Sequence, residues 1–162
     1  MRRAIVSDSH RKMLAVGSEM PCHDLPPRAA FETVHIGQVF RVSESFRYTE
    51  MDQFAALSGD YSAIHTDAET AKRLGFPDRL QYGFLLASLL SRVVGTNFDS
   101  AVCAAVSVDF VKPAIAGERI AVRAEVTQVQ KAMRSVVLRI TMLGKDGVIA
   151  RGKLTTVFLS ER

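Results

Sequence analysis

The segment SGDYSAIHTD, residues 58–67, places two acids and a histidine between two stretches with helical patterns. Carboxylic acids and histidine are the side chains that most often transfer protons in enzymes, and each contributes about 10²–10⁴ in rate when positioned at a reacting group. Asp60 and His65 are therefore candidates for acid–base catalysis. The residue types alone also fit an ordinary turn, because Asp60 follows a glycine that can end a helix and His65 precedes a helix start. The rest of the chain has to decide between these interpretations.

Two short helices are expected on either side of this segment. Residues 49–59, TEMDQFAALSG, have an apolar stripe at helical spacing, with Thr49 as the expected N-cap and a terminal glycine. Residues 66–75, TDAETAKRLG, open with a T-x-x-E capping box that begins at Thr66 and end at a second glycine. The intervening DYSAIH is expected to be a loop, and Asp67 a first-turn acid favoured by the helix dipole.

A third helix, residues 82–94, is expected to be buried. It is apolar almost all round, so it has no solvent-facing side of normal width. Residues 31–49 suggest one or two strands before it, and four alternating segments follow it, residues 104–113, 118–130, 135–143 and 148–159. Short turns between consecutive strands predict an antiparallel sheet. The sequence therefore predicts an α+β fold in which a sheet wraps around one long helix.

Length and composition favour a single globular domain. The chain has 162 residues, enough for one core, and we expect a flexible N-terminal arm over residues 1–28 and one domain over 29–162. The net charge of +4 is spread among interspersed acids without a dense basic run, which argues against nucleic-acid binding. No segment is long and apolar enough to span a membrane.

Cysteine usage favours a reduced, cytoplasmic protein. Cys22 and Cys103 lie far apart in sequence, and neither belongs to a metal-type cluster. Cys103, on an expected strand, is expected to be a small core residue. The N-terminus is basic but lacks the apolar region of a secretory signal.

The loop and the buried helix together, SGDYSAIHTDAETAKRLGFPDRLQYGFLLASLLSRVVG, resemble the signature region of the MaoC-like (R)-specific enoyl-CoA hydratases and 3-hydroxyacyl dehydratases. That family carries D-x-N-P-x-H, an acidic residue, an Ala-rich helix, GF, and an HG-x-L step that opens the central helix. The corresponding positions here are Asp60 to His65, Asp67, Gly75-Phe76 and Tyr82-Gly83. VDFVKPAIAGERIAVRAEVTQV resembles the family's F-x-x-P-v-x-x-G-d strand pair, so the resemblance covers about residues 35–158.

The resemblance implies a hot-dog fold and a lyase that hydrates a trans-2-enoyl-CoA or enoyl-ACP to the (R)-3-hydroxyacyl thioester, or dehydrates it in reverse. Asp60 and His65 would be the catalytic pair and would hold one water between them. Gly83 would offer a backbone N–H at the helix start to the thioester oxygen, where the helix dipole favours negative charge. Ser91 and Tyr82 are further candidates for oxyanion or substrate binding.

No metal and no redox cofactor are expected, because the CoA or pantetheine thioester is part of the substrate. Arg79, Lys112 and Arg134 are candidate partners for the phosphates of that carrier. Resemblance to hot-dog domains also implies a homodimer with its sites near the interface.

Three residues depart from the family pattern. Ser62 stands where the family has Asn, Ala63 where it has Pro, and Tyr82 where it has His. Ser62 is expected to support the loop, but a hydroxyl has one donor and a shorter reach than an amide. Ala63 lacks the ring that fixes φ. These departures leave two alternatives open, a non-catalytic protein that binds acyl thioesters and, less favoured, an acyl-CoA thioesterase.

Overall fold

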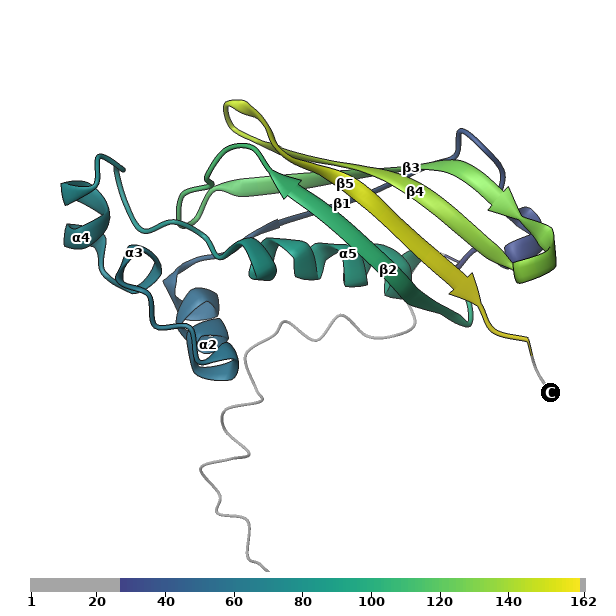
Figure 1. Ribbon diagram of the computed structural model, residues 1–162, viewed down its shortest axis with the longest axis horizontal. Coiled ribbons are helices and arrows are strands. Elements are labelled where there is room, and N and C mark those ends of the chain that lie inside the picture. The colour runs from purple at the N-terminus through teal and green to yellow at the C-terminus, as the bar shows by residue number, and fades with distance from the viewer. Residues whose placement is uncertain (1–26, 161–162) are drawn as a thin grey trace, which may run out of the picture.

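The computed structural model describes residues 27–160, so the predicted arm and Cys22 lie outside the described residues except for residues 27 and 28. In chain order the elements are η1 (Phe31–Thr33), β1 (Val39–Ser45), α2 (Tyr48–Ser58), α3 (Ala63–Thr66), α4 (Ala68–Arg73), α5 (Gly83–Asn97), β2 (Ala101–Phe110), β3 (Arg119–Gln130), η2 (Lys131–Met133), β4 (Ser135–Gly144) and β5 (Gly147–Phe158). Figure 1 shows α2, α3 and α4 grouped at one end, beyond the start of α5.

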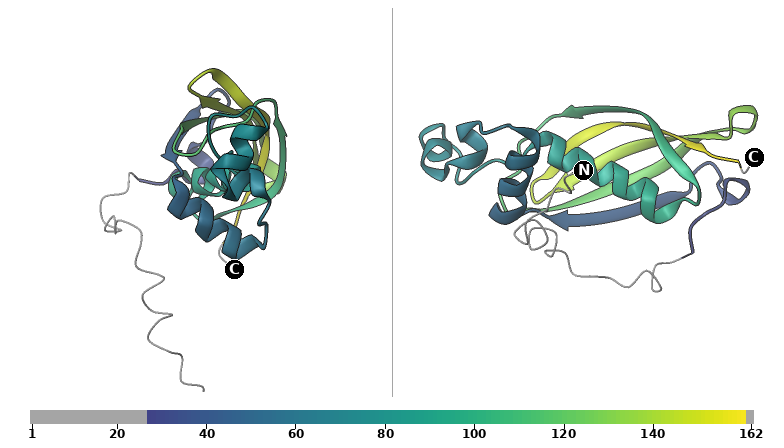
Figure 2. Two further views of the ribbon diagram at one scale, coloured as in Figure 1. Left: turned by 90° about the vertical axis from the view of Figure 1, so that its left-hand side faces the viewer. Right: turned by 90° about the horizontal axis from the view of Figure 1, so that it is seen from below.

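The strands form one antiparallel sheet that wraps around α5, in the order β1-β3-β4-β5-β2 (Figures 1 and 2). The alternation of side chains along a strand gives the sheet one buried face. In β3, every second residue from Ile120 to Val126 is buried, while the intervening residues face outward. The inward side chains of the sheet pack with the leucines of α5 into a single core. The predicted α+β class, with a sheet around a long helix, is confirmed.

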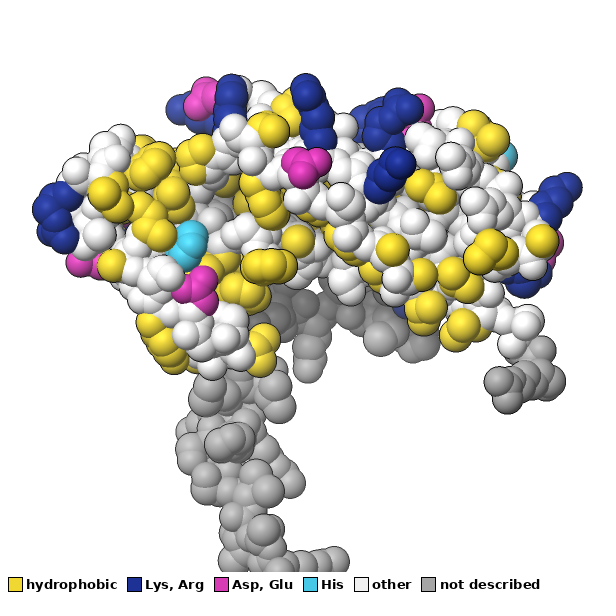
Figure 3. Space-filling model, in the orientation of Figure 1, with side chains coloured by type: hydrophobic (Ala, Val, Ile, Leu, Met, Phe, Trp, Pro, Cys, Tyr) yellow, Lys and Arg dark blue, Asp and Glu magenta, His cyan; other side chains and the backbone are white. Residues whose placement is uncertain are grey.

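The outer face of the sheet, away from α5, is rich in cations. Arg41 lies directly opposite Arg123 on the neighbouring strand, and Arg139 lies opposite Lys153. Figure 3 shows Lys and Arg side chains gathered along this side of the molecule. Glu125 offsets part of the charge through a 2.6 Å ion pair with Arg123. Like charges directly across strands repel, so these pairs do not stabilise the sheet.

Helix α5 is buried on one side only, which corrects the prediction of a helix buried all round. Six apolar residues on its inner side are buried, namely Leu85, Leu86, Leu89, Leu90, Val93 and Val94. On the other side Phe84 is 83% exposed, and Ser88, Ser91 and Gly95 are also exposed. Strand β2 next to this side is an edge strand that pairs only with β5. Cys103 on β2 is therefore exposed, not in the core as predicted.

The N-cap of helix α2 lies two residues earlier than expected. The helix starts at Tyr48 with Arg47 as the N-cap, in place of the predicted Thr49. The cause is Glu50, whose carboxylate accepts a hydrogen bond from the Arg47 N–H at 2.8 Å. The helix ends as predicted at Gly59, which adopts the left-handed conformation with φ of 75°.

The segment between α2 and α4 is more ordered than the predicted loop. A single helical turn, α3, spans Ala63–Thr66 and carries His65. The N-cap of α4 is Asp67, not Thr66 as predicted. Oδ1 of Asp67 accepts from the backbone N–H groups of Glu69 and Thr70, so it satisfies two of the donors that the start of α4 leaves without partners in the helix.

Helix α5 runs to Asn97, beyond the predicted end, and it is the longest helix in the described part of the chain. No helix among residues 27–160 is both long and apolar enough to cross a membrane. The same residues contain no group of three His, Cys, Asp or Glu side chains that could hold a metal ion.

Candidate active site

Asp60 lies directly after the end of α2, with one carboxylate oxygen occupied and the other open. Its Oδ1 accepts hydrogen bonds from the backbone N–H of Ser62 at 3.0 Å and from the Ser62 hydroxyl at 2.5 Å. No residue between 27 and 160 donates to Oδ2. The Ser62 hydroxyl, followed by the Ser62 N–H, lowers the pKa of Asp60 below its ordinary value, with a smaller contribution from His65. Asp60 is therefore a carboxylate at neutral pH with a free acceptor oxygen.

His65 is held in one tautomer by a backbone carbonyl. Its Nδ1 lies 2.9 Å from the carbonyl oxygen of Leu80, which can only accept. Nδ1 therefore carries the proton, and in the neutral ring Nε2 is left as an acceptor. The ring is half-buried in α3. A histidine in this state can accept a proton from water and later return it.

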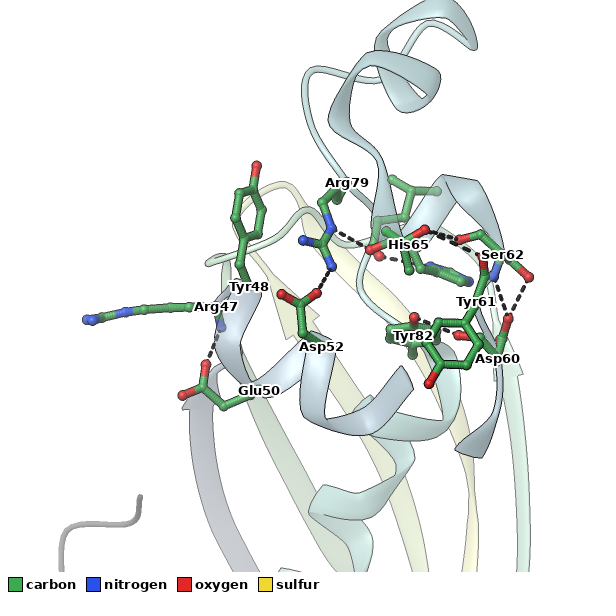
Figure 4. Close-up of polar contacts among 12 residues, drawn as sticks. Arg47, Tyr48, Glu50, Asp52, Asp60, Tyr61, Ser62, His65, Arg79 and Tyr82 are labelled. Atoms are coloured by element: carbon green, nitrogen blue, oxygen red, sulfur yellow. Dashed lines mark hydrogen bonds and ion pairs between the residues drawn. The ribbon is translucent and has the colours of Figure 1, made fainter. Parts of the chain in front are cut away.

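Tyr82 contacts both members of the predicted pair. Its hydroxyl donates to the carbonyl oxygen of Asp60 at 2.9 Å, and its ring stacks on the His65 ring with 4.1 Å between centroids. Figure 4 shows Asp60, His65 and Tyr82 together, with Ser62 beside Asp60. Tyr82 is only 2% exposed, and burial raises its pKa. Tyr82 therefore supports Asp60 and His65 from the protein interior and offers little surface to a substrate.

Gly83 is the first residue of α5, where backbone N–H groups lack partners within the helix. The N-cap residue, Tyr82, makes no side-chain bond to these groups. A Cβ at Gly83 would lie 3.1 Å from the ring of Phe110, so a larger residue here would push against that ring. A hollow of about 360 Å³ opens beside Gly83 and is lined largely by apolar residues, among them Leu86 and Phe110.

Ser91 is not brought to Asp60 and His65. It lies eight residues along α5 from Gly83, about 12 Å by the rise of a helix, on the exposed side of α5. Sequence reasoning missed the Leu80 carbonyl, which orients His65, and the Phe110 ring, which covers Gly83. No signal in residue type could have found the first, since any residue has a carbonyl.

The site combines two acceptors, Asp60 Oδ2 and His65 Nε2, with donors at the start of α5. Two acceptors near one another can hold a water molecule through both of its protons and direct its lone pair outward. Donors at a helix N-terminus favour an oxygen that gains negative charge. The arrangement suits the addition of water to a polarised double bond, or the reverse elimination.

The fold and this site define a hot-dog domain with an acid–histidine pair next to the start of its central helix. The chain matches the MaoC-like domain family over residues 32–148 and belongs to that family. It is similar to the (R)-specific enoyl-CoA hydratase of Aeromonas caviae, with 28% identity over 74% of this chain and 90% of that protein. The solved structure of the A. caviae (R)-hydratase involved in PHA biosynthesis aligns over 79% of this chain and 99% of its own, with a TM-score of 0.76 and 26% identity.

Two plant proteins named as mitochondrial 3-hydroxyacyl-[acyl-carrier-protein] dehydratases are also similar. The FERN protein of Solanum lycopersicum is 25% identical over 82% of each chain. The Arabidopsis thaliana protein is 32% identical over 85 residues, and the match spans about half of each chain. Family membership and these relatives support a hydratase or dehydratase activity for this chain.

Proposed function

We propose that the protein hydrates a trans-2-enoyl thioester to the (R)-3-hydroxyacyl thioester, or dehydrates it in reverse. The observation that carries the proposal is the pairing of Asp60 and His65, each with one free acceptor atom, through their shared contact with Tyr82. In hydration, a water held between the two adds its oxygen to the β-carbon. One of the pair takes a proton from that water, and a proton returns from the pair to the α-carbon, so that H₂O is added in total.

The start of α5 would stabilise the negative charge that develops on the thioester oxygen. The Gly83 N–H is the proposed donor, and the adjoining hollow would receive the acyl thioester. Ser91 remains a proposed substrate contact farther along α5. No resident metal or redox cofactor is needed for this chemistry.

The carrier would be CoA or the pantetheine arm of an acyl carrier protein, since relatives of both kinds are similar to this chain. Of the three candidate phosphate partners, Lys112 is the best supported, because it lines the hollow beside Gly83. Arg79 is buried and already engaged with Asp52. Arg134 is paired with Glu32 and lines a different hollow, together with Phe158.

The departures at Ser62 and Tyr82 do not weaken the case for an enzyme, because both residues contact the pair. The test is hydration of crotonyl-CoA and longer enoyl-CoAs, with Asp60→Asn and His65→Gln as controls. We expect turnover in the wild type and a loss of about 10²–10⁴ in each variant. Tight acyl-CoA binding without hydration would instead indicate the non-catalytic alternative, and release of free thiol from saturated acyl-CoA would indicate a thioesterase.

We further propose a homodimer formed through β2 and the open side of α5. Strand β2 is an edge strand that pairs, among residues 27–160, with β5 alone. Its Val102 and Val106 are exposed at 45% and 48%, and such an edge favours pairing with another strand. The cationic outer face of the sheet would repel a second copy, whereas this side is apolar. Light scattering is expected to give the mass of a dimer, and Val106→Glu is expected to lower it. A monomer at micromolar concentration would contradict this arrangement.

The cytoplasmic location stays a prediction. The two plant relatives are named as mitochondrial, which concerns those proteins.

A further inference from the structure

The helix that carries His65 is too short to stand alone. Helix α3 has only four residues, and an isolated turn is unstable because nucleation fixes several residues for one hydrogen bond. Its stability has to come from contacts with other segments. Two of its carbonyls, those of Ile64 and His65, point to residues 79 and 80, which lie in the connection before α5.

Three hydrogen bonds tie this connection to α3. The Leu80 N–H donates to the carbonyl of Ile64 at 3.1 Å, and the Leu80 carbonyl accepts from His65 Nδ1 at 2.9 Å. The third bond is from a side chain, because Arg79 Nε donates to the carbonyl of His65 at 2.5 Å. Arg79 therefore closes the C-terminal end of α3 by satisfying a carbonyl that the helix leaves free.

Arg79 is itself fixed by a second helix. It is 5% exposed, and its Nη2 contacts Asp52 Oδ1 on α2 at 2.5 Å. Its guanidinium lies over the ring of Tyr48, 4.5 Å from the ring centroid. The Tyr48 hydroxyl donates to Asp78, the residue before Arg79. Figure 4 shows Arg79 between Asp52 and His65.

We propose that Arg79 is a positioning residue that aims the imidazole of His65 by anchoring its peptide group to α2. This inference rests on the proposed catalytic role of His65. A buried cation is costly to desolvate, and here Nε, Nη2 and one face of the guanidinium each have a partner. Because the His65 carbonyl and Nδ1 are both held by residues 79 and 80, the ring cannot turn without breaking a bond.

The role requires a guanidinium. The planar fork of arginine can donate from Nε and Nη2 in two fixed directions while its face stacks on Tyr48. An ammonium is a point charge and cannot reproduce this geometry. Asp52 is 62% exposed in its side chain, so it can be hydrated when Arg79 is replaced, whereas the His65 carbonyl loses its partner.

The test compares Arg79→Lys with Arg73→Lys. Arg73 is an exposed arginine on the neighbouring α4, and the hydrogen bond of its side chain within the described residues goes to Thr70 in the same helix, which makes it a matched control. Two quantities are measured. The first is kcat and KM with crotonyl-CoA. The second is the ¹⁵N NMR signal of the His65 ring, assigned by its loss in His65→Gln.

We expect Arg79→Lys to lower kcat about tenfold to a hundredfold with KM nearly unchanged, because a small misplacement of a catalytic group costs that much. The His65 ring is expected to change from one Nδ1–H tautomer to a mixture. Arg73→Lys is expected to change neither quantity. A single tautomer and a kcat within twofold of wild type in Arg79→Lys would overturn the proposal.

Two further variants distinguish a positioning role of Arg79 from a general loss of stability. Guanidinium added to Arg79→Ala is expected to restore part of kcat, which a loss of general stability would not allow. If Arg79→Lys does not fold, Asp52→Asn weakens the anchor at an exposed position, and an unchanged tautomer and kcat in that variant would refute the inference. If the wild type hydrates no enoyl thioester, the proposed function fails, but the tautomer measurement still decides the role of Arg79.

Discussion

Asp60 and Asp67 lie seven residues apart and are held by the same kind of local contact, yet they differ in whether the second carboxylate oxygen has a donor among the described residues. Each Oδ1 accepts a backbone N–H from two residues onward, and each carboxylate also accepts a side-chain hydroxyl, from Ser62 or Thr70. In both residues these hydrogen bonds lower the pKa, with the hydroxyl as the largest cause. By local geometry alone the two acids would be equivalent.

The second oxygen distinguishes them. In Asp67 the Thr70 hydroxyl binds Oδ2 at 3.0 Å, and Oδ1 takes two backbone donors, so the carboxylate is fully used as the cap of α4. In Asp60 both Ser62 donors bind Oδ1, and Oδ2 has no donor among residues 27–160. A capping acid and a candidate catalytic acid therefore differ in where one hydroxyl points. Activity should depend on Asp60, and stability on Asp67.

The largest expected effect comes from replacing each acid by alanine. Asp60→Ala should lower kcat for enoyl-CoA hydration by about 10²–10⁴, because it removes one of the two acceptors that hold the water. Asp67→Ala should leave kcat within a few-fold of wild type and lower the melting temperature by about 2–4 °C, because α4 loses its N-cap. Kinetics and calorimetry on both variants test the contrast. Equal losses of kcat in the two variants would show that the acids are not specialised.

Contacts between residues close together in sequence can be predicted from the sequence. Ser62 lies two residues from Asp60, and a hydroxyl at that distance commonly bonds a carboxylate in a turn. The choice of cap for α4 was predicted wrongly, because Thr66 and Asp67 are both good caps. Only the geometry shows that the Thr66 hydroxyl faces back to the Ser62 carbonyl at 3.2 Å.

Contacts between distant residues could not be predicted. The Tyr82 hydroxyl meets the Asp60 carbonyl across 22 residues, and His65 meets the Leu80 carbonyl across 15. The exposure of one side of α5 could not be predicted either. Phe84 and the small residues after it have the same sequence pattern whether the chain's own sheet or a second copy covers them. The fold class, by contrast, followed from the alternation in β3 and β4, which is a property of the strands themselves.

A smaller effect on kcat is expected from Tyr82→Phe. This variant tests whether Asp60 depends on a hydrogen bond from a distant side chain, which Asp67 lacks among the described residues. The change removes the hydroxyl that bonds the Asp60 carbonyl and keeps the ring against His65. A neutral hydrogen bond contributes about 0.5–1.5 kcal/mol, so kcat should fall about twofold to tenfold. The matched control is Tyr61→Phe, since Tyr61 is next to Asp60, is 67% exposed and has a hydroxyl without a partner among the described residues. A fall of the same size in both variants would remove the special role of Tyr82.

The smallest expected effect concerns the pKa of each acid. Ser62→Ala removes the hydroxyl that most lowers the pKa of Asp60, while the backbone N–H of residue 62 stays, so the pKa should rise toward its ordinary value without reaching it. Thr70→Val should do the same for Asp67 only. Each lowered pKa contributes stability that is present above the unfolded-state pKa and is lost as pH falls through the folded-state value, so each variant should be less destabilised by acid than the wild type.

Carboxyl ¹³C NMR titrations of the wild type and the two variants measure these shifts. The two acids should respond separately, since each hydroxyl bonds only its own carboxylate. If Ser62→Ala moved both pKa values, the two turns would be coupled through α3. The difference between the capping acid and the catalytic acid would then not be set by each residue's own contacts. If it moved only Asp60, the Ser62 hydroxyl would lower the pKa of Asp60 alone while leaving its Oδ2 free.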